Sequence, residues 1–363
     1  MPAPQKPGTK LAPGPETSRR KVTIFDVAER AGVSIKTVSR VVNNEANVRE
    51  KTREKVLGVV RELQYKPNAA ARELSGRRSR TIGLVYENAE EFNYTSAVLN
   101  GALGACEARG YSLLLCPLNL PNPDIGERVR GFATQARVEG IVLPAPVGDV
   151  VEVTGALKDM RIPFAAIAPR DPLPAEINIG CKDEQATFSL TEYLIGQGHR
   201  SIGYIKGHPE HGASAKRFSG YRRALEKHGL AIAPGLVRQG YFDFDSGKTC
   251  AAELLDLPEP PTAIVAGNDD MAAGVLFEAR ERGLPLPGRL SVVGFDDTRI
   301  ASRLWPPLTT VRQPILQMAE TAARLLIGRL NGEAMDAPQE PFDCEVVIRE
   351  SAVPLTGIVP SEC

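Results

Sequence analysis

Residues 23–44 read TIFDVAERAGVSIKTVSRVVNN, and this stretch has the pattern of two short helices joined by a tight turn. Apolar residues repeat at helical spacing from Ile24 to Ala31 and form one stripe. Gly32 can end the first helix in a left-handed conformation, and Ser34 can cap the second. A second helix placed after such a turn is the element that helix-turn-helix proteins present to the major groove of DNA.

Charge is distributed unevenly along the chain. Residues 19–80 contain sixteen Lys or Arg and seven Asp or Glu, a net charge of +9, and residues 1–18 add +1. Because the whole chain balances at 44 against 44, residues 81–363 carry −10. A basic head can neutralise DNA phosphates and release their counterions, and the same field repels an acidic body.

Length and composition exclude several classes of protein. A chain of 363 residues predicts two or three domains, and it has no run of 18 apolar residues that could span a membrane. Residues 1–20 lack the apolar region of a signal peptide, so we expect a disordered tail on a cytoplasmic protein. The six cysteines are scattered without a C-x-x-C motif, so no metal site, cofactor or disulfide framework is expected.

The order of patterns predicts a small helical head and a larger α/β body. We expect a helix-turn-helix domain over residues 21–67, a hinge helix or linker over 68–80, a two-lobed body over 81–355 and a tail over 356–363. Apolar runs separated by amphipathic stretches predict two parallel sheets flanked by helices. The strand-like runs are TIGLVY, YSLLLC, GIVLPA, FAAIA, SIGYI, AIVAG and LSVVGF. The helical stretches between them include residues 95–109, 185–197, 219–227, 246–255 and 271–282.

Over residues 21–350 the chain resembles the lactose-repressor/galactose-repressor (LacI-type) family of bacterial transcription regulators. Besides the opening stretch, the motifs that carry the resemblance are VREKTREKVLGVVRELQYKPN, AAARELSGRRSRTIGLV, LVRQGYFDFDSG, AIVAGNDDMAAGV and LSVVGFDDTRIASRLWPPLTTVRQP. The resemblance implies an N-terminal all-α helix-turn-helix head and an α/β body like the periplasmic binding proteins.

The resemblance also implies where DNA is contacted. Ile35, Lys36 and Arg40 open the second helix, where base edges are read. Lysine and arginine can donate to guanine O6 and N7, whereas isoleucine offers only an apolar contact. In the linker, Leu74, with Ala71 nearby, would be a wedge inserted between base pairs. The remaining candidates, which are expected to bind phosphate, cap helices or add polar contacts, are Thr23, Ser34, Thr37, Ser39, Asn43 and Asn47.

A small-molecule site between the lobes is implied in the same way. Its candidate residues are Asn93, Tyr94, Arg170, Arg217, Phe242, Asn268 and Asp296. The planar fork of Arg217 suits two acceptors, Phe242 can stack on an apolar face, and Asn268 and Asp296 suit vicinal hydroxyls. The acidic neighbours Asp269, Asp270 and Asp297 are expected to be structural, and His208 and His211 are not expected to form a metal site.

The sequence therefore predicts a DNA-binding transcription regulator, most simply a repressor, whose affinity for DNA a small molecule controls. We expect a homodimer on a palindromic double-stranded operator and a sugar or sugar derivative as effector, acting either as inducer or as corepressor. A purine or a sugar acid stays open as effector. A sugar-binding transport protein is disfavoured by the basic head and the missing signal peptide. An enzyme is disfavoured because no nucleophile–base pair or phosphate loop accompanies the aspartates.

Overall fold

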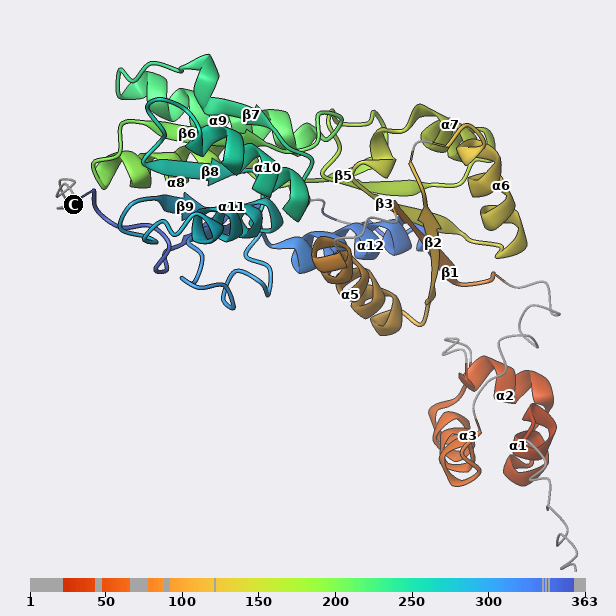
Figure 1. Ribbon diagram of the computed structural model, residues 1–363. Helices are drawn as coiled ribbons and strands as arrows, with labels where there is room; N and C mark the ends of the chain where they lie inside the picture. Colours follow the sequence, from red (N-terminus) through yellow and green to blue (C-terminus); the bar gives the residue numbers. More distant parts are fainter. Residues whose placement is uncertain are drawn as a thin grey trace, which may run out of the picture. The chain divides into compact units, whose positions relative to one another are not determined.

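The structure is a computed structural model that describes residues 22–42, 48–65, 78–87, 92–120, 122–334, 336, 338 and 340–355. The chain divides into two compact units, Met1–Arg78 and Ser79–Cys363, which we call the head and the body (Figure 1). Among the described residues, no helix combines the length and the apolar character needed to cross a membrane.

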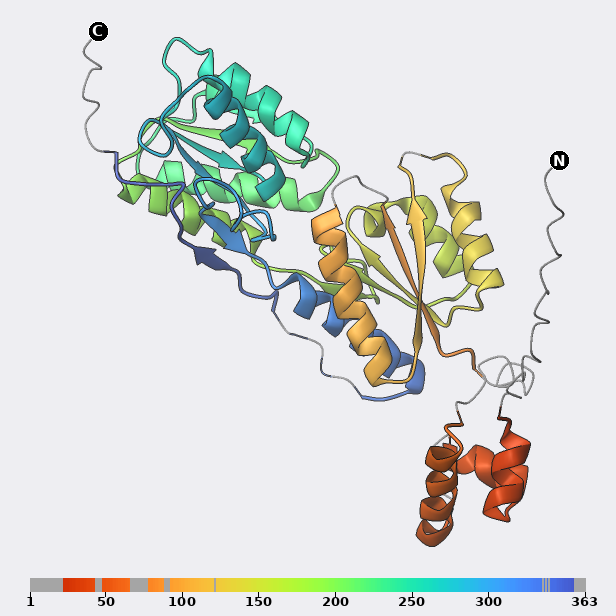
Figure 2. The same ribbon diagram turned by 60° about the horizontal axis from the view of Figure 1, so that its bottom comes forward.

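The described part of the head consists of three helices around a small apolar core (Figure 2). They are α1 (Ile24–Ala31), α2 (Ile35–Val42) and α3 (Glu50–Glu62). The buried side chains of this core are those of Val27, Ala28, Ala31, Val38, Val41, Val56 and Val59. Each helix turns one apolar stripe inward, as the spacing in the sequence predicts.

The body begins with a lobe built on a parallel five-stranded sheet in the order β2-β1-β3-β4-β5. Its strands are β1 (Thr81–Glu87), β2 (Ser112–Leu118), β3 (Gly140–Pro144), β4 (Phe164–Ile167) and β5 (Ile177–Ile179). One face is covered by α5 (Phe92–Ala108) and α12 (Ile315–Asn331), which lie side by side in Figures 1 and 2. The other face is covered by α6 (Ile125–Gln135) and α7 (Val151–Asp159). We call this the N-terminal lobe.

The second, C-terminal lobe repeats the plan with a four-stranded parallel sheet in the order β7-β6-β8-β9. Its strands are β6 (Ile202–Lys206), β7 (Val237–Gln239), β8 (Ala263–Ala266) and β9 (Ser291–Val293). The helices that pack on it are α8 (Asp183–Gly196), α9 (Gly212–Lys227), α10 (Phe244–Leu255) and α11 (Asp269–Glu281). The pair α8 and α9 shields one face and the pair α10 and α11 the other, each over its own apolar core.

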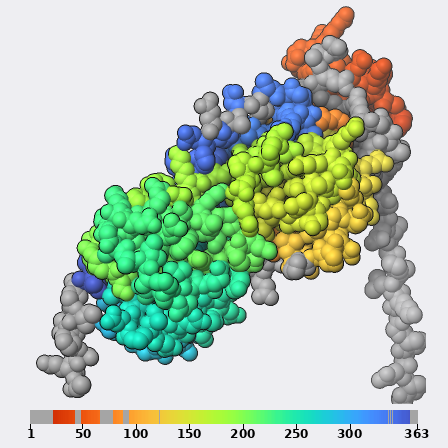
Figure 3. Space-filling model, turned by 90° about the horizontal axis from the view of Figure 1, so that it is seen from above, coloured from red at the N-terminus to blue at the C-terminus, as the bar shows by residue number. Residues whose placement is uncertain are grey.

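The chain crosses between the two lobes three times. It leaves the N-terminal lobe between β5 and α8, returns between β10 (Thr310–Arg312) and α12, and leaves again between α12 and β11 (Glu345–Val347). Strands β10 and β11 pair antiparallel, and Cys181 on the first crossing bridges to Phe342 on the third. The lobes adjoin each other in Figure 3, where the C-terminal lobe is green and teal and the N-terminal lobe mainly yellow.

The predicted architecture of a helical head and two parallel sheets flanked by helices is confirmed. One predicted boundary is wrong, because α9 begins at Gly212 and not at residue 219. Its first turns hold polar residues that the sequence pattern does not mark as buried, although Arg217 there is 5% exposed. The packing of α12 on the N-terminal lobe was also not predicted, because the residues of a helix do not indicate which of two sheets it covers.

Candidate functional site

In the head, local hydrogen bonds fix both helices of the turn. The backbone amide and the hydroxyl of Thr23 both donate to Asp26 Oδ2 at 2.7 Å, which closes the start of α1. Gly32 ends α1 with φ of 62°. Ser34 Oγ accepts from the Thr37 amide at 3.2 Å and lies 2.9 Å from the Thr37 hydroxyl, so Ser34 caps α2 as predicted.

Helix α2 buries Val38 and Val41 and turns other side chains outward. Ile35 is 39% exposed, and Lys36 is exposed in the same first turn. Arg40 is half-buried one turn later, on the same face as Lys36. Ser39 and Thr37 are also half-buried. The predicted DNA contacts Asn43, Asn47, Ala71 and Leu74 lie outside the described residues.

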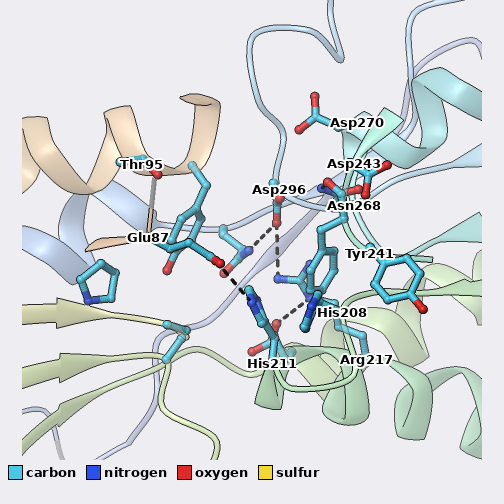
Figure 4. Close-up of a pocket in the computed structure, with 18 of the residues that line it drawn as sticks. Glu87, Thr95, His208, His211, Arg217, Tyr241, Asp243, Asn268, Asp270 and Asp296 are labelled. Atoms are coloured by element: carbon cyan, nitrogen blue, oxygen red, sulfur yellow. Dashed lines mark hydrogen bonds and ion pairs between the residues drawn. The ribbon is translucent and has the colours of Figure 1, made fainter. Parts of the chain in front are cut away.

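The body contains a cavity of about 390 Å³ to which both lobes contribute (Figure 4). Its lining residues are Tyr86, Glu87, Tyr94, Thr95, Pro144, Ala145, Ala168, Asp183, His208, His211, Ala213, Arg217, Tyr241, Phe242, Asp243, Asn268, Asp270, Asp296 and Gln313. Most of them stand at or just beyond the carboxyl ends of parallel strands, where open α/β sheets bind ligands. The predicted Tyr94, Arg217, Phe242, Asn268 and Asp296 are thus brought together.

Arg217 is held in the cavity wall by two carboxylates. Its Nε donates to Asp183 Oδ1 at 2.9 Å, and its terminal nitrogens lie 3.4 Å from Asp296 Oδ1 and 2.7 Å from the carbonyl of Gly267. The guanidinium also stacks 3.7 Å from the centre of the Phe295 ring. Burial opposes its charge, but Asp296 and Asp183 outweigh burial and raise the pKa of Arg217.

Asp296 occupies a constrained position at the end of β9. Its φ of 114° lies in the region that side chains rarely adopt, so the backbone is held there by its surroundings. The amide of Gln313 donates to its carboxylate, beside the contact with Arg217. Burial raises the pKa of Asp296, and the charge of Arg217 opposes that rise. Gln313 lies on the second crossing, before α12, so this hydrogen bond connects the cavity wall to a segment that joins the two lobes.

Asn268 and Phe242 support each other. Asn268 Oδ1 accepts from the Met271 amide at 2.9 Å and caps α11, while its Nδ2 donates to the carbonyl of Phe242 at 2.7 Å. Phe242 adopts a positive φ of 70°. A Cβ atom on Gly207 would lie 1.9 Å from the Phe242 ring, so glycine is required there. Both polar atoms of the Asn268 side chain therefore have backbone partners and support this part of the cavity wall.

Two histidines and a glutamate meet across the cavity. The rings of His208 and His211 have centroids 5.0 Å apart, and His211 Nε2 lies 3.9 Å from Glu87 Oε2 on β1 (Figure 4). Burial, reinforced by His208, lowers the pKa of His211 to about 4, and burial raises the pKa of Glu87. His211 is therefore uncharged at neutral pH. In the described parts of the chain, no three His, Cys, Asp or Glu side chains are grouped to hold a metal ion.

Three of the candidate residues lie in places that were not expected from the sequence. Arg170 does not line it; its side chain is exposed and donates to the carbonyls of Pro209 and Glu210. Asn93 does not line it either, and its amide lies 3.5 Å from Asp270 Oδ1, between the lobes. Asp270, predicted to be structural, does line the cavity.

The other two aspartates are structural as predicted. Asp269 is fully buried and accepts from Thr298 and Thr310. Asp297 pairs with Arg312 and Arg349.

Several lining residues were missed by sequence reasoning, above all Asp183 and Gln313. Asp183 is the first residue of α8, directly after the first crossing, and Gln313 lies on the second crossing, so neither belongs to the motifs that contain Arg217 and Asp296. Tyr86 and Glu87, by contrast, end a recognisable strand run, and the rule that ligands bind at carboxyl ends of strands could have found them.

Comparison with known proteins agrees with this arrangement. Residues 23–68 match the family described as "Bacterial regulatory proteins, lacI family", and residues 191–352 match a "Periplasmic binding protein-like domain". Catabolite control protein A of Priestia megaterium is 34% identical over 332 residues, which cover 91% of this chain and 99% of that protein. The chain belongs to the LacI family of bacterial regulatory proteins.

Other relatives of this LacI-family regulator are similar over nearly the whole chain. The HTH-type transcriptional regulator DegA of Bacillus subtilis (strain 168) is 36% identical, with 92% of this chain and 99% of DegA covered. The HTH-type transcriptional repressor PurR of Vibrio campbellii (strain ATCC BAA-1116) is 33% identical, with 91% and 98% covered.

Among solved structures, the Lac repressor dimer bound to operator and the anti-inducer ONPF has a TM-score of 0.76 at 30% identity, covering 92% of this chain and all of that one. The transcriptional regulator CelR–cellobiose complex has a TM-score of 0.68 at 30% identity, covering 91% of this chain and all of that one. The relatives are transcription regulators and not enzymes, and this chain is a transcription regulator with an effector-binding body.

Proposed function

We propose that this regulator is a cytoplasmic, homodimeric repressor that binds a palindromic operator and changes its affinity when a carbohydrate occupies the body. The observation that carries the proposal is the cavity at the carboxyl ends of strands from both lobes. A ligand there touches both lobes, so its binding depends on how they are arranged.

A carbohydrate fits the lining better than a purely apolar ligand. Asp183, Arg217 and Asp296 present fixed charged groups on one wall, and Tyr241 and Phe242 present rings beside them. Sugars combine a dense set of hydroxyl donors and acceptors with an apolar face, which these two kinds of side chain complement. One solved relative, CelR, is described as a complex with cellobiose.

A purine is the second candidate for the effector. The aromatic side chains Tyr86, Tyr94, Tyr241 and Phe242 offer stacking surfaces for a flat ring. The relative named PurR supports this alternative. A sugar acid loses support, because Arg170 is outside the cavity and Arg217 already pairs with two carboxylates.

The proposed DNA contacts are those of α2. Lys36 and Arg40 share one face of this helix, and Ile35 adds an apolar surface in its first turn. Lysine and arginine can pair with guanine, and isoleucine can contact a thymine methyl. One such head reads only a half-site, and two-fold proteins match two-fold operators, so we propose a homodimer. The edge strand β2 exposes Leu114 and Leu115, which are 40% and 44% accessible and suit a subunit interface.

The proposal is tested in two steps with the full chain. Selection of bound duplexes from a random pool is expected to return a palindromic sequence. Binding without any sequence preference would contradict the proposal that α2 recognises bases. A thermal-shift screen of sugars and purine bases is then expected to identify a stabilising ligand. That ligand is expected to change the affinity for the selected duplex; a ligand that stabilises the protein without altering DNA affinity would contradict the proposed control.

A further inference from the structure

The lining of the cavity is strongly acidic. Five of its side chains are carboxylates, namely those of Glu87, Asp183, Asp243, Asp270 and Asp296, whereas Arg217 is its only guanidinium and no lysine lines it among the described residues. Five carboxylates against one guanidinium give these groups of the lining a formal net charge of −4.

The one strong base of the described lining is not available to an anion. Arg217 donates to Asp183 at 2.9 Å and to the carbonyl of Gly267 at 2.7 Å, and it lies 3.4 Å from Asp296. A phosphate or carboxylate entering the cavity would have to share this guanidinium with two carboxylates that already balance its charge. Displacing one of them instead would leave a buried charge without its partner, which is costly.

The remaining carboxylates come from both lobes. Glu87 ends β1 in the N-terminal lobe, and Asp270 lies in the first turn of α11 in the C-terminal lobe. Asp243, which caps α10 by accepting from the Ser246 amide, lies near Asp270 and apart from Glu87 in Figure 4. Carboxylates of both lobes therefore line the cavity, and an anionic ligand brought close to them is bound more weakly because like charges repel.

Hydrogen-bond chemistry favours the same ligands. Ionised carboxylates are acceptors only, so in any hydrogen bond between one of them and a ligand the ligand must be the donor. The hydroxyls of a neutral sugar and the ammonium of an amino sugar can donate, whereas the oxygens of a phosphate or carboxylate cannot. The acidic lining thus combines charge repulsion with a mismatch of acceptors against acceptors.

We propose that the cavity selects its effector by charge: it takes a neutral or amine-bearing carbohydrate and excludes sugar phosphates and sugar acids, with Glu87 and Asp270 as the residues that set this preference. The inference rests on the proposed carbohydrate function and adds the charge class of the ligand. Glu87 is half-buried and Asp270 is 6% exposed, so both act with little screening by solvent.

The test uses the full-length protein and matched probe sets. Each set contains a neutral sugar, its amino form, its 6-phosphate and its uronic acid, taken across common hexoses and, for the neutral sugars, disaccharides such as cellobiose. Titration calorimetry is expected to show binding of one neutral or amino sugar and a dissociation constant at least about a hundredfold weaker for its anionic forms.

Two variants assign the preference, and a third controls for net charge. Glu87→Gln and Asp270→Asn keep the size of the side chain and one acceptor oxygen, remove one charge each and replace the other acceptor by a donor. The double variant is expected to narrow the gap in affinity between neutral and anionic forms at least about tenfold. Glu259→Gln removes a charge from an exposed position outside the lining and is expected to leave the gap unchanged. Unfolding curves of all variants verify that each is folded.

The possible results distinguish the charge selection from the proposed carbohydrate function itself. Equal or tighter binding of an anionic form by the wild type would overturn the charge selection and leave a carbohydrate effector standing. A gap that does not narrow in folded Glu87→Gln, Asp270→Asn protein would overturn the assignment to these residues. Absence of binding by every sugar, neutral, cationic and anionic, would overturn the proposed carbohydrate function and this inference with it.

Discussion

At the scale of single residues, the wall of the cavity contains a buried cluster of one arginine and two aspartates. Arg217 is 5% exposed and lies between Asp183 and Asp296, which are 4% and 9% exposed. A buried pair adds little net stability when it is intact, but removal of one member leaves the other charge without compensation. The cavity wall is therefore sensitive to loss of its guanidinium in a way that surface ion pairs are not.

We predict that Arg217→Met lowers the free energy of unfolding by about 3–5 kcal/mol, because Asp183 and Asp296 are left buried without their positively charged partner. Urea denaturation of the full chain measures the change. Arg223→Met is the matched control, since Arg223 pairs with Glu184 at the surface and such pairs contribute about 0–1 kcal/mol. Similar losses in the two variants would contradict the special role of the buried arginine.

Two histidines have lowered pKa values in the folded body. Burial lowers the pKa of His199, which is 2% exposed among Thr262, Ser291 and the carbonyl of Val353, and burial lowers the pKa of His211 to about 4. Below their ordinary pKa of about 6.5 the unfolded chain binds protons that the native state does not.

We therefore predict that the contribution of these histidines to the free energy of unfolding decreases as the pH falls from about 6.5 towards 4 and is nearly constant above 7, whereas the raised pKa values of Asp296 and Glu87 act in the opposite direction. Urea titrations at a series of pH values measure the slope. His211→Gln is expected to reduce the slope without abolishing it, because His199 remains. An unchanged slope in that variant would mean that His211 does not titrate as its burial implies.

At the scale of elements, local chemistry was predictable and distant packing was not. Ser34 and Gly32 act on neighbours within a few residues, so their roles as cap and helix end follow from the sequence. Arg170 sits in a motif that resembles a ligand loop, yet its guanidinium meets two carbonyls some forty residues later. The sequence pattern predicts strands and helices, but it does not indicate which loops pack against each other in the folded body.

Helix α2 provides a prediction of its own. Lys36→Ala and Arg40→Ala are each expected to cost about 1–3 kcal/mol on the selected operator and much less on random duplex, because both side chains are proposed to pair with bases. Fluorescence anisotropy at fixed salt measures both affinities. Equal losses on the two kinds of DNA would reduce these residues to phosphate contacts.

Gly207, directly after β6, provides a second prediction at this scale. Gly207→Ala places a Cβ atom against the ring of Phe242, and we expect this to displace the ring, to weaken ligand binding and to lower the free energy of unfolding by about 1–3 kcal/mol. Gly131→Ala in α6, where nothing lies within 4 Å of the added atom, is the control. A normal ligand affinity in Gly207→Ala would show that Phe242 can move without consequence for the cavity.

At the scale of the whole molecule, ligand and operator act on the same equilibrium of lobe arrangements. Because coupling between two binding sites is reciprocal, a ligand that weakens operator binding by some factor must itself be bound more weakly, by the same factor, when the operator is present. Titration of the ligand with and without saturating operator measures that factor. A ligand affinity that ignores the operator, while operator affinity responds to ligand, would exclude this form of control.

The three crossings of the chain also decide when the body can fold during synthesis. Helix α5 emerges early from the ribosome, but its partner α12 follows only after the whole C-terminal lobe up to β10. At about 5–20 residues per second the first lobe waits roughly 10–40 s for its missing helix. The C-terminal lobe waits as well, since beyond β11 the hydroxyl of Ser351 donates to the carbonyl of Val292 and the amide of Val353 donates to Ser291 Oγ. Both lobes therefore receive their last segments within a short interval of synthesis, and a chain truncated before α12 would contain neither lobe in complete form.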